Sequence, residues 1–133
     1  MIGLDTNVLV RYLVQDDPAQ SAVASRVIDD AARKGESLAI SPIVLCEVVW
    51  VLESAYAEPR ARVAEAIERV LRTKQFEVLE RDLLWPACEE YRRGPGDLAD
   101  YYLGRRHRVA GADETLTFDQ ALKSSKHFRV LKA

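Results

Sequence analysis

Short apolar segments of strand-like composition alternate with longer helical patterns along the whole chain, and this alternation limits the fold more than any other feature. The strand-like segments lie at residues 1–5, 37–41, 76–79 and 115–118, and an edge strand is expected at 129–131. Short strands separated by helices favour a mainly parallel sheet with helices on both faces. We therefore predict a three-layer α/β/α fold with a sheet of four to five strands, in a single domain over residues 1–133.

Local signals mark several helix boundaries. Asp16-Asp17-Pro18 ends a helix that begins near Val8 and starts a second one, which Lys34-Gly35 then ends. Asp97 is placed to cap a helix that runs to about Val109. Further helices are expected at 42–56, 60–72 and 82–92 with a short one after Asp119, and residues 1–5 are expected to form a buried strand.

Composition indicates a soluble globular protein. Hydrophobic residues make up 48% and charged residues 30% of the chain, and no apolar run is long enough to cross a bilayer. The formal net charge of −2 excludes binding of nucleic acid through bulk positive charge but allows local basic patches. The start of the chain, Met1 to Asp5, has no basic segment typical of a secretion signal, so we expect a cytoplasmic protein with no membrane association.

Two of the strand-like segments end directly in an acid. Asp5 follows the first and Asp119 follows the fourth. Taken singly, each has an alternative explanation as the cap of the next helix. Because ligands of open parallel sheets bind at the carboxyl ends of the strands, two acids at the same edge favour a binding site.

Glu47 lies in an otherwise apolar helical stretch and shares a helix face with Ile43 and Trp50. We expect it to be buried, and a buried, unpaired carboxylate costs several kcal/mol. A bound ligand would compensate for this; the alternatives are an arginine salt bridge or a hydrogen bond in the core. Trp50 is expected to pack in the core.

Asp97 and Asp100 lie three residues apart, so both project from one side of the first turn of the same helix. Acids there also interact favourably with the helix dipole, which is the alternative explanation. Asp100 is the stronger candidate ligand, because Asp97 can be fully used as the cap. Gly104, one turn later, would allow neighbouring backbone to approach closely.

The chemistry follows if Asp5, Glu47, Asp100 and Asp119 converge. Carboxylates in such a cluster cannot all ionise without a counter-ion. Oxygen ligands without histidine or cysteine fit Mg²⁺ or Mn²⁺, which bind phosphate oxygens and activate water. The pattern therefore predicts metal-dependent phosphodiester hydrolysis. His107 and His127 are single residues that we expect on the surface.

Four segments resemble those of PIN domains, and in particular the VapC-type toxins of bacterial toxin–antitoxin pairs. These segments are 2–13 (IGLDTNVLVRYL), 47–54 (EVVWVLES), 94–104 (GPGDLADYYLG) and 115–122 (TLTFDQAL). The resemblance covers nearly the whole chain and implies a metal-dependent endoribonuclease. It implies that Asp5, Glu47, Asp100 and Asp119 bind Mg²⁺ or Mn²⁺ and that Asp97 is an additional acid of one branch of the family. It also implies that Thr6, Asn7 and Thr117 orient ligands or water.

The resemblance further implies three partners: an RNA substrate, a second copy in a homodimer, and a small antitoxin whose C-terminal segment lies across the site. The helices at 8–14, 43–56 and 60–72 are expected to form the groove for the antitoxin. Arg11 and the cluster Arg105–Arg108 are candidate phosphate contacts, although charge runs are usually solvated faces. Tyr101 and Tyr102 are candidates for base stacking.

Other protein classes remain open at this stage. In a haloacid dehalogenase-like phosphatase the acid after the first strand is a nucleophile, with a second aspartate two residues on and a lysine near the last acids. Position 7 is asparagine here, and Lys123 fits only loosely. A receiver-like signalling domain would need adjacent acids after the first strand and an aspartate in mid-chain that accepts phosphate. The last alternative is a PIN-like scaffold that binds RNA or a protein without cutting.

Overall fold

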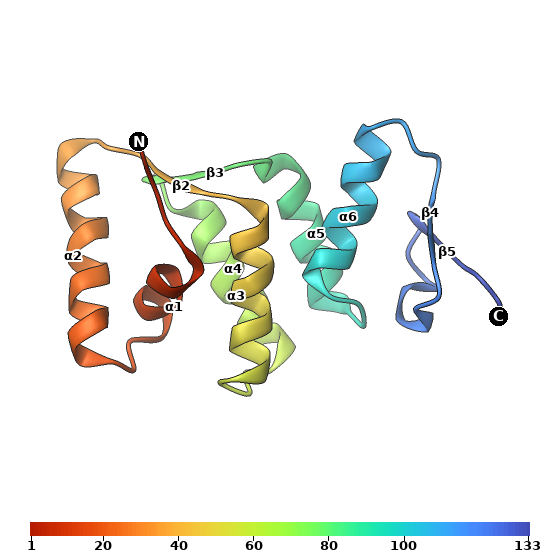
Figure 1. Ribbon diagram of the computed structural model, residues 1–133, viewed down its shortest axis with the longest axis horizontal. Helices are drawn as coiled ribbons and strands as arrows, with labels where there is room; N and C mark the ends of the chain where they lie inside the picture. Colours follow the sequence, from red (N-terminus) through yellow and green to blue (C-terminus); the bar gives the residue numbers. More distant parts are fainter. The chain divides into compact units, whose positions relative to one another are not determined.

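The computed structural model describes residues 1–133, which divide into two units, Met1–Arg81 and Asp82–Ala133 (Figure 1). All strand pairs are parallel. The predicted α/β/α class with parallel strands is confirmed. The strands number five, but they form a three-stranded sheet, β1–β2–β3, and a separate pair, β4–β5.

The first unit carries the three-stranded sheet and four helices. In chain order its elements are β1 (Ile2–Gly3), α1 (Thr6–Val14), α2 (Pro18–Lys34), β2 (Leu38–Ile40), α3 (Pro42–Ser54), α4 (Arg60–Arg72) and β3 (Phe76–Val78). Leu38 of β2 is in register with Ile2 of β1 and with Phe76 of β3. Helix α1 packs between α2 and α3, and α4 packs on α3 and β3 (Figure 1).

The boundaries of α2 follow the local signals in the sequence. Asp17 caps the helix, because its Oδ1 accepts a hydrogen bond from the backbone N–H of Gln20 at 3.0 Å. Pro18 occupies the first turn, where its missing N–H is not needed. Gly35 ends the helix with a φ of 67°, a left-handed conformation that glycine adopts without strain. These predictions are confirmed.

The core of this unit forms from alternating strand residues and from one face of each helix. Leu38, Ile40, Phe76 and Val78 are buried. The outer strand β1 differs from the prediction, because the side chain of Ile2 is 50% exposed and only the following Leu4 is buried. The expectation of a buried first strand is therefore wrong for β1, which has a single hydrogen-bonded neighbour, β2.

The second unit contains two helices and the strand pair. Its elements are α5 (Arg81–Arg93), α6 (Leu98–Val109), β4 (Thr115–Thr117), the 3₁₀ helix η1 (Gln120–Leu122) and β5 (Phe128–Val130). Arg105 of α6 forms an ion pair with Glu90 of α5 at 2.7 Å. A Cβ atom added at Gly104 would lie 2.7 Å from Cε2 of Phe128 and 3.0 Å from Cβ of His127. The close approach predicted at Gly104 is thus present, but the neighbours are side chains rather than backbone.

No helix combines the length and the apolar composition that a membrane-spanning segment requires.

Candidate metal-binding site

In the first unit, Thr6 is hydrogen-bonded to the two candidate metal ligands of that unit, Asp5 and Glu47. Asp5 follows the first strand and caps α1, and its Oδ1 accepts the backbone N–H of Thr6 at 2.8 Å. The hydroxyl of Thr6 donates to Oε1 of Glu47 on α3 at 3.1 Å. Thr6 itself is buried, so the surrounding packing fixes both hydrogen bonds. The structure therefore brings Asp5 and Glu47 to one place, although they lie far apart in the sequence.

The burial expected for Glu47 is wrong. Helix α3 turns Val44, Leu45, Val48, Val49 and Leu52 into the core, and this leaves Glu47 exposed. Helix α3 is apolar on nearly all sides, and the sequence pattern therefore did not reveal which side faces the core. Because Glu47 is exposed, its charge has no large burial cost that a ligand would need to compensate. Glu47 also has no arginine or lysine partner, which excludes the salt-bridge alternative.

The second unit carries the other three acids. Asp97 is the N-cap of α6, and its backbone N–H donates to Oδ2 of Asp100 at 3.1 Å. Asp119 follows β4 and caps η1, with its Oδ1 accepting the backbone N–H of Ala121 at 2.9 Å. The backbone N–H of Asp119 donates to the hydroxyl oxygen of Thr117 at 3.0 Å. Asp100 thus takes part in the cap that the sequence assigned to Asp97 alone.

Asp100 is half-buried, and its surroundings disfavour its charged form. Burial raises the pKa of Asp100 above its ordinary value, and the neighbouring carboxylates of Asp97 and Asp119 raise it further, against the hydrogen bond from the Asp97 backbone. The effect of Asp119 places that carboxylate within electrostatic range of Asp100. A bound positive ion would favour the ionised form of these carboxylates.

Asp5, Glu47, Asp100 and Asp119 share one hydrogen-bonding arrangement. In each, one carboxylate oxygen accepts a hydrogen bond from a nearby N–H or hydroxyl group, while the second oxygen accepts none from the protein. None of the four forms a salt bridge. Each side chain is held in place by one oxygen and has a second oxygen available to a ligand.

This donor set fits a hard divalent cation, because all five candidate ligands are carboxylates. Neither unit by itself gathers three or more acidic, histidine or cysteine side chains in an arrangement that could hold a metal ion. The carboxylates of Asp5 and Glu47 in the first unit, and of Asp97, Asp100 and Asp119 in the second, are each of the ligand type that Mg²⁺ and Mn²⁺ prefer.

The candidate phosphate contacts are largely occupied by protein partners. Arg11 donates through Nε to Gln20 at 2.7 Å and through Nη1 to Asp16 and to the hydroxyl of Tyr56, both at 3.1 Å. In the basic cluster, Arg105 pairs with Glu90, and Arg108 donates to the backbone oxygen of Asp113. These contacts match the alternative explanation of structural or solvated arginines.

The aromatic and histidine residues are placed differently from the predictions. The core role expected for Trp50 is wrong, because its side chain is 69% exposed. Tyr101, a candidate for base stacking, is buried, and its hydroxyl accepts the backbone N–H of Gly96 at 2.8 Å. His107 is exposed as expected, whereas His127 is partly buried with its Nε2 atom enclosed and unbonded. This burial lowers the pKa of His127.

The sequence matches the family described as PIN domain over residues 2–124. This match spans both units and nearly the whole chain. The chain belongs to the PIN domain family. It is also similar to a protein named VapC ribonuclease from Aquifex aeolicus (strain VF5), at 25% identity over 120 residues that cover 90% of this chain and 88% of that protein. No solved structure matches the chain significantly.

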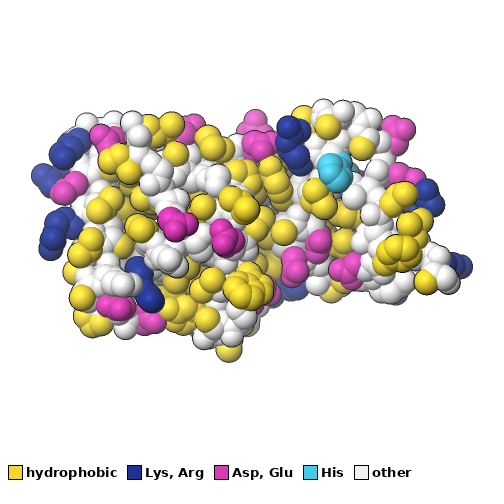
Figure 2. Space-filling view, in the orientation of Figure 1, with side chains coloured by type: hydrophobic (Ala, Val, Ile, Leu, Met, Phe, Trp, Pro, Cys, Tyr) yellow, Lys and Arg dark blue, Asp and Glu magenta, His cyan; other side chains and the backbone are white.

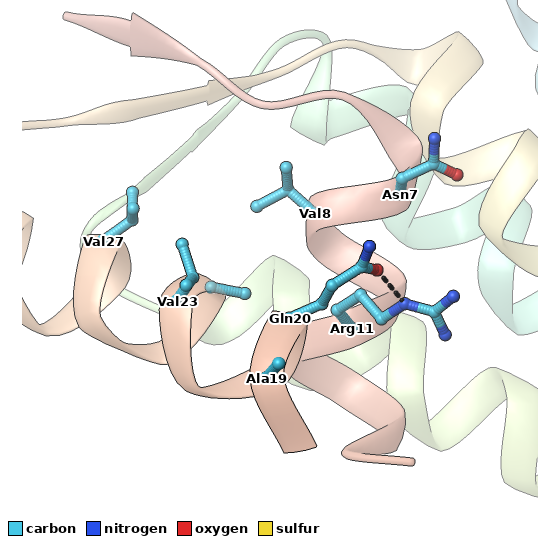
Figure 3. Close-up of a pocket in the computed structure, with 8 residues that line it drawn as sticks. Asn7, Val8, Arg11, Ala19, Gln20, Val23 and Val27 are labelled. Atoms are coloured by element: carbon cyan, nitrogen blue, oxygen red, sulfur yellow. Dashed lines mark hydrogen bonds between the residues drawn. The ribbon is translucent and has the colours of Figure 1, made fainter. Parts of the chain in front are cut away.

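Helix α1 of this PIN family member borders at least three hollows, two of which reach α2 or α3. The larger, of about 420 Å³, lies between α1 and α2, and Figure 3 shows Val8 and Val23 beside it, with Asn7 at the start of α1. The sequence did not predict it, although the two valines Val23 and Val27, four residues apart on one side of α2, were a visible signal. In the structure they lie off the buried stripe of that helix. The second, of about 310 Å³, lies among α1, α3 and α4, the helices predicted to form a groove.

Proposed function

We propose that the chain is a metal-dependent endoribonuclease in which Asp5, Glu47, Asp100 and Asp119 bind Mg²⁺ or Mn²⁺, with Asp97 as an additional acid. Family membership and the likeness to a protein named VapC ribonuclease support this function. The observation that carries it is that each of the four acids accepts a hydrogen bond from the protein on one carboxylate oxygen and leaves the other oxygen without a protein donor.

The residues of the chain have distinct tasks in this reaction. When bound, Mg²⁺ or Mn²⁺ supplies Lewis-acid chemistry, which neutralises phosphate charge and makes a bound water more acidic. Asp5 and Asp100 are assigned to the main cation, and Glu47 and Asp119 to a second cation or to positioning the attacking water. Thr6 orients Glu47 through its hydroxyl.

Two further polar residues support the acids. Thr117 fixes the start of η1 by accepting the backbone N–H of Asp119. Asn7 is exposed directly after the Asp5–Thr6 pair, where its amide can contact water or substrate. Arg11, one turn further along α1, is assigned to RNA binding only through the part of its guanidinium that Gln20, Asp16 and Tyr56 leave unused.

We further propose that the protein is the toxin of a toxin–antitoxin pair, acting in the cytoplasm as a homodimer. The likeness to a protein named VapC ribonuclease, which covers 90% of this chain and 88% of that protein, supports this role together with the four segments that resemble VapC-type toxins. The hollow among α1, α3 and α4 is a candidate groove for the antitoxin. It combines apolar residues such as Leu13 and Leu52 with the charged residues Glu58, Arg62 and Arg69, a surface suited to an amphipathic segment.

The decisive experiment compares wild type with Asp5→Asn and Asp119→Asn on structured RNAs, in Mg²⁺, in Mn²⁺ and with a chelator. Asparagine is as good a helix cap as aspartate, so both variants should keep their capping hydrogen bonds and fold normally. Asp29→Asn, which changes an exposed acid on α2, is the matched control for the loss of one charge. We expect cation-dependent cutting by wild type and by the control, and a large loss of cutting in both site variants.

Cutting by the site variants at the wild-type rate, or cutting by wild type in the presence of chelator, would remove the metal-dependent mechanism. RNA binding by wild type without any cutting under these conditions would leave the non-catalytic PIN-like scaffold as the function. Co-purification with a protein expressed from an adjacent reading frame, and release of cutting when that protein is removed, tests the toxin role.

A further inference from the structure

The outer face of α3 carries two large apolar side chains on either side of a candidate metal ligand. Ile43 is 67% exposed and Trp50 is 69% exposed, with Glu47 between them at helical spacing. Hydrophobic side chains reach the surface over α3 on the face seen in Figure 2. Three successive positions on one face of this helix are thus apolar, acidic and aromatic.

The fold does not need Trp50. The core side of α3 is complete with five buried aliphatic residues, and the indole makes no ring contact and no hydrogen bond. An exposed tryptophan beside a functional carboxylate is therefore available to a ligand, and exposed apolar groups of this kind mark binding surfaces.

We propose that Trp50 is a substrate-positioning residue that stacks on a base of single-stranded RNA next to the phosphodiester held at Glu47. The inference rests on the proposed ribonuclease function and extends it to how the substrate is held. Trp50 follows Glu47 by three residues on a helix, which puts their Cβ atoms about 5–6 Å apart. Thr6 holds the carboxylate of Glu47 through its hydroxyl, so the acidic member of this pair has a fixed position.

The chemistry of this face favours RNA over a protein partner. Helix α3 contains no lysine or arginine, and Glu47 lies in the middle of the face. A protein that covered Ile43 and Trp50 would bury Glu47 and would have to supply a positive charge of its own, because α3 has none. A cation-bound phosphate would compensate for Glu47, while the flat ring of Trp50 would receive a base by stacking, the usual way in which proteins hold single-stranded RNA.

The test measures cation-dependent cleavage of a single-stranded RNA of mixed sequence by wild type, Trp50→Ala and Trp50→Phe. Val109→Ala, which removes exposed apolar surface near the end of α6, is the control for a general loss of surface hydrophobicity. Loss of one stacked base should raise KM about 5- to 150-fold in Trp50→Ala with kcat little changed. Trp50→Phe keeps an aromatic face and should retain most of the wild-type affinity.

A second measurement separates stacking from a structural role. When one base near the cleavage site is replaced by an abasic nucleotide, the affinity of wild type for the RNA should fall to that of Trp50→Ala. The affinity of Trp50→Ala should not fall further. In a Trp85→Phe variant, which leaves Trp50 as the only tryptophan, binding of the intact RNA should quench the fluorescence and binding of the abasic RNA should quench it less.

The outcomes distinguish this inference from the proposed function. If wild type cuts RNA with cations but Trp50→Ala has the same KM, the stacking role is overturned and the ribonuclease function stands. If Trp50→Ala changes the oligomeric state in solution instead of the KM, the face serves self-association and the stacking role is again overturned. If wild type neither binds nor cuts RNA, both proposals fail together.

Discussion

The hydrogen bond from Thr6 to Glu47 is the contact in this protein that most directly connects folding with the proposed activity. Thr6→Val removes the hydroxyl that donates to Oε1 of Glu47 at 3.1 Å and keeps the size and branching of a side chain that is only 7% exposed. The backbone N–H of Thr6 can still donate to Asp5. The substitution therefore releases Glu47 and leaves Asp5 in place.

The expected cost in stability is small. A hydrogen bond to a charged group contributes about 1.5–3 kcal/mol where water is excluded. Glu47 is exposed, so water replaces the lost donor and the expected decrease in the free energy of unfolding is about 1 kcal/mol or less. For a chain of this size that corresponds to a fall in Tm of roughly 3–5 °C. Thermal unfolding followed by circular dichroism measures it.

The expected cost in activity is larger. Groups that orient a metal ligand typically change metal affinity or activity by about 10- to 100-fold when they are removed. Thr6→Val should therefore lower cation-dependent RNA cleavage by about that factor and raise the Mg²⁺ concentration needed for half-maximal rate. Thr6→Ser keeps the hydroxyl and should restore most of the activity. If Thr6→Val and Thr6→Ser cut RNA equally well, Thr6 does not orient Glu47 and the reasoning is refuted.

Three other variants test the second unit. Burial raises the pKa of Asp100, so the folded protein binds the carboxyl proton of Asp100 more tightly than the unfolded chain does. Above this raised pKa, ionised Asp100 therefore lowers the free energy of unfolding. Below the ordinary aspartate pKa the carboxyl is protonated in both states, and the loss of stability vanishes. In chelator, Asp100→Asn should therefore be more stable than wild type to urea at pH 7 but not at pH 3, and equal stability at both would contradict the burial effect. Gly104→Ala adds a Cβ atom 2.7 Å from Phe128, at a cost of about 1–3 kcal/mol, against a gain of about 1 kcal/mol in helix propensity. We expect a net loss of about 1 kcal/mol in urea unfolding, and a rise in stability would show that the Phe128 ring simply moves aside. Asp119→Ala should be about 1 kcal/mol less stable than Asp119→Asn, because only asparagine can still cap η1, and both should lack cation-dependent cleavage. Equal thermal stability of the two would show that the cap contributes nothing.

The sequence by itself determined the elements whose ends carry local signals. Asp17-Pro18 and Gly35 fix α2, and Asp97 fixes the start of α6, because capping bonds and backbone preferences act between residues close in the chain. The acids at the ends of strands and helices were predictable for the same reason. Asp5 and Asp119 follow β1 and β4, and each also caps the helix that begins after it.

Only the tertiary structure decided what depends on contacts between distant segments. The apolar composition of α3 did not show that Glu47 and Trp50 face outward, because which side of such a helix is buried depends on what packs against it. The bond from Thr6 to Glu47 joins residues on different helices, and the partial burial of His127 depends on the place where β5 meets α6 at Gly104. Hydrogen bonds between strands are also non-local, which is why the predicted sheet of four to five strands is instead a set of three and a pair.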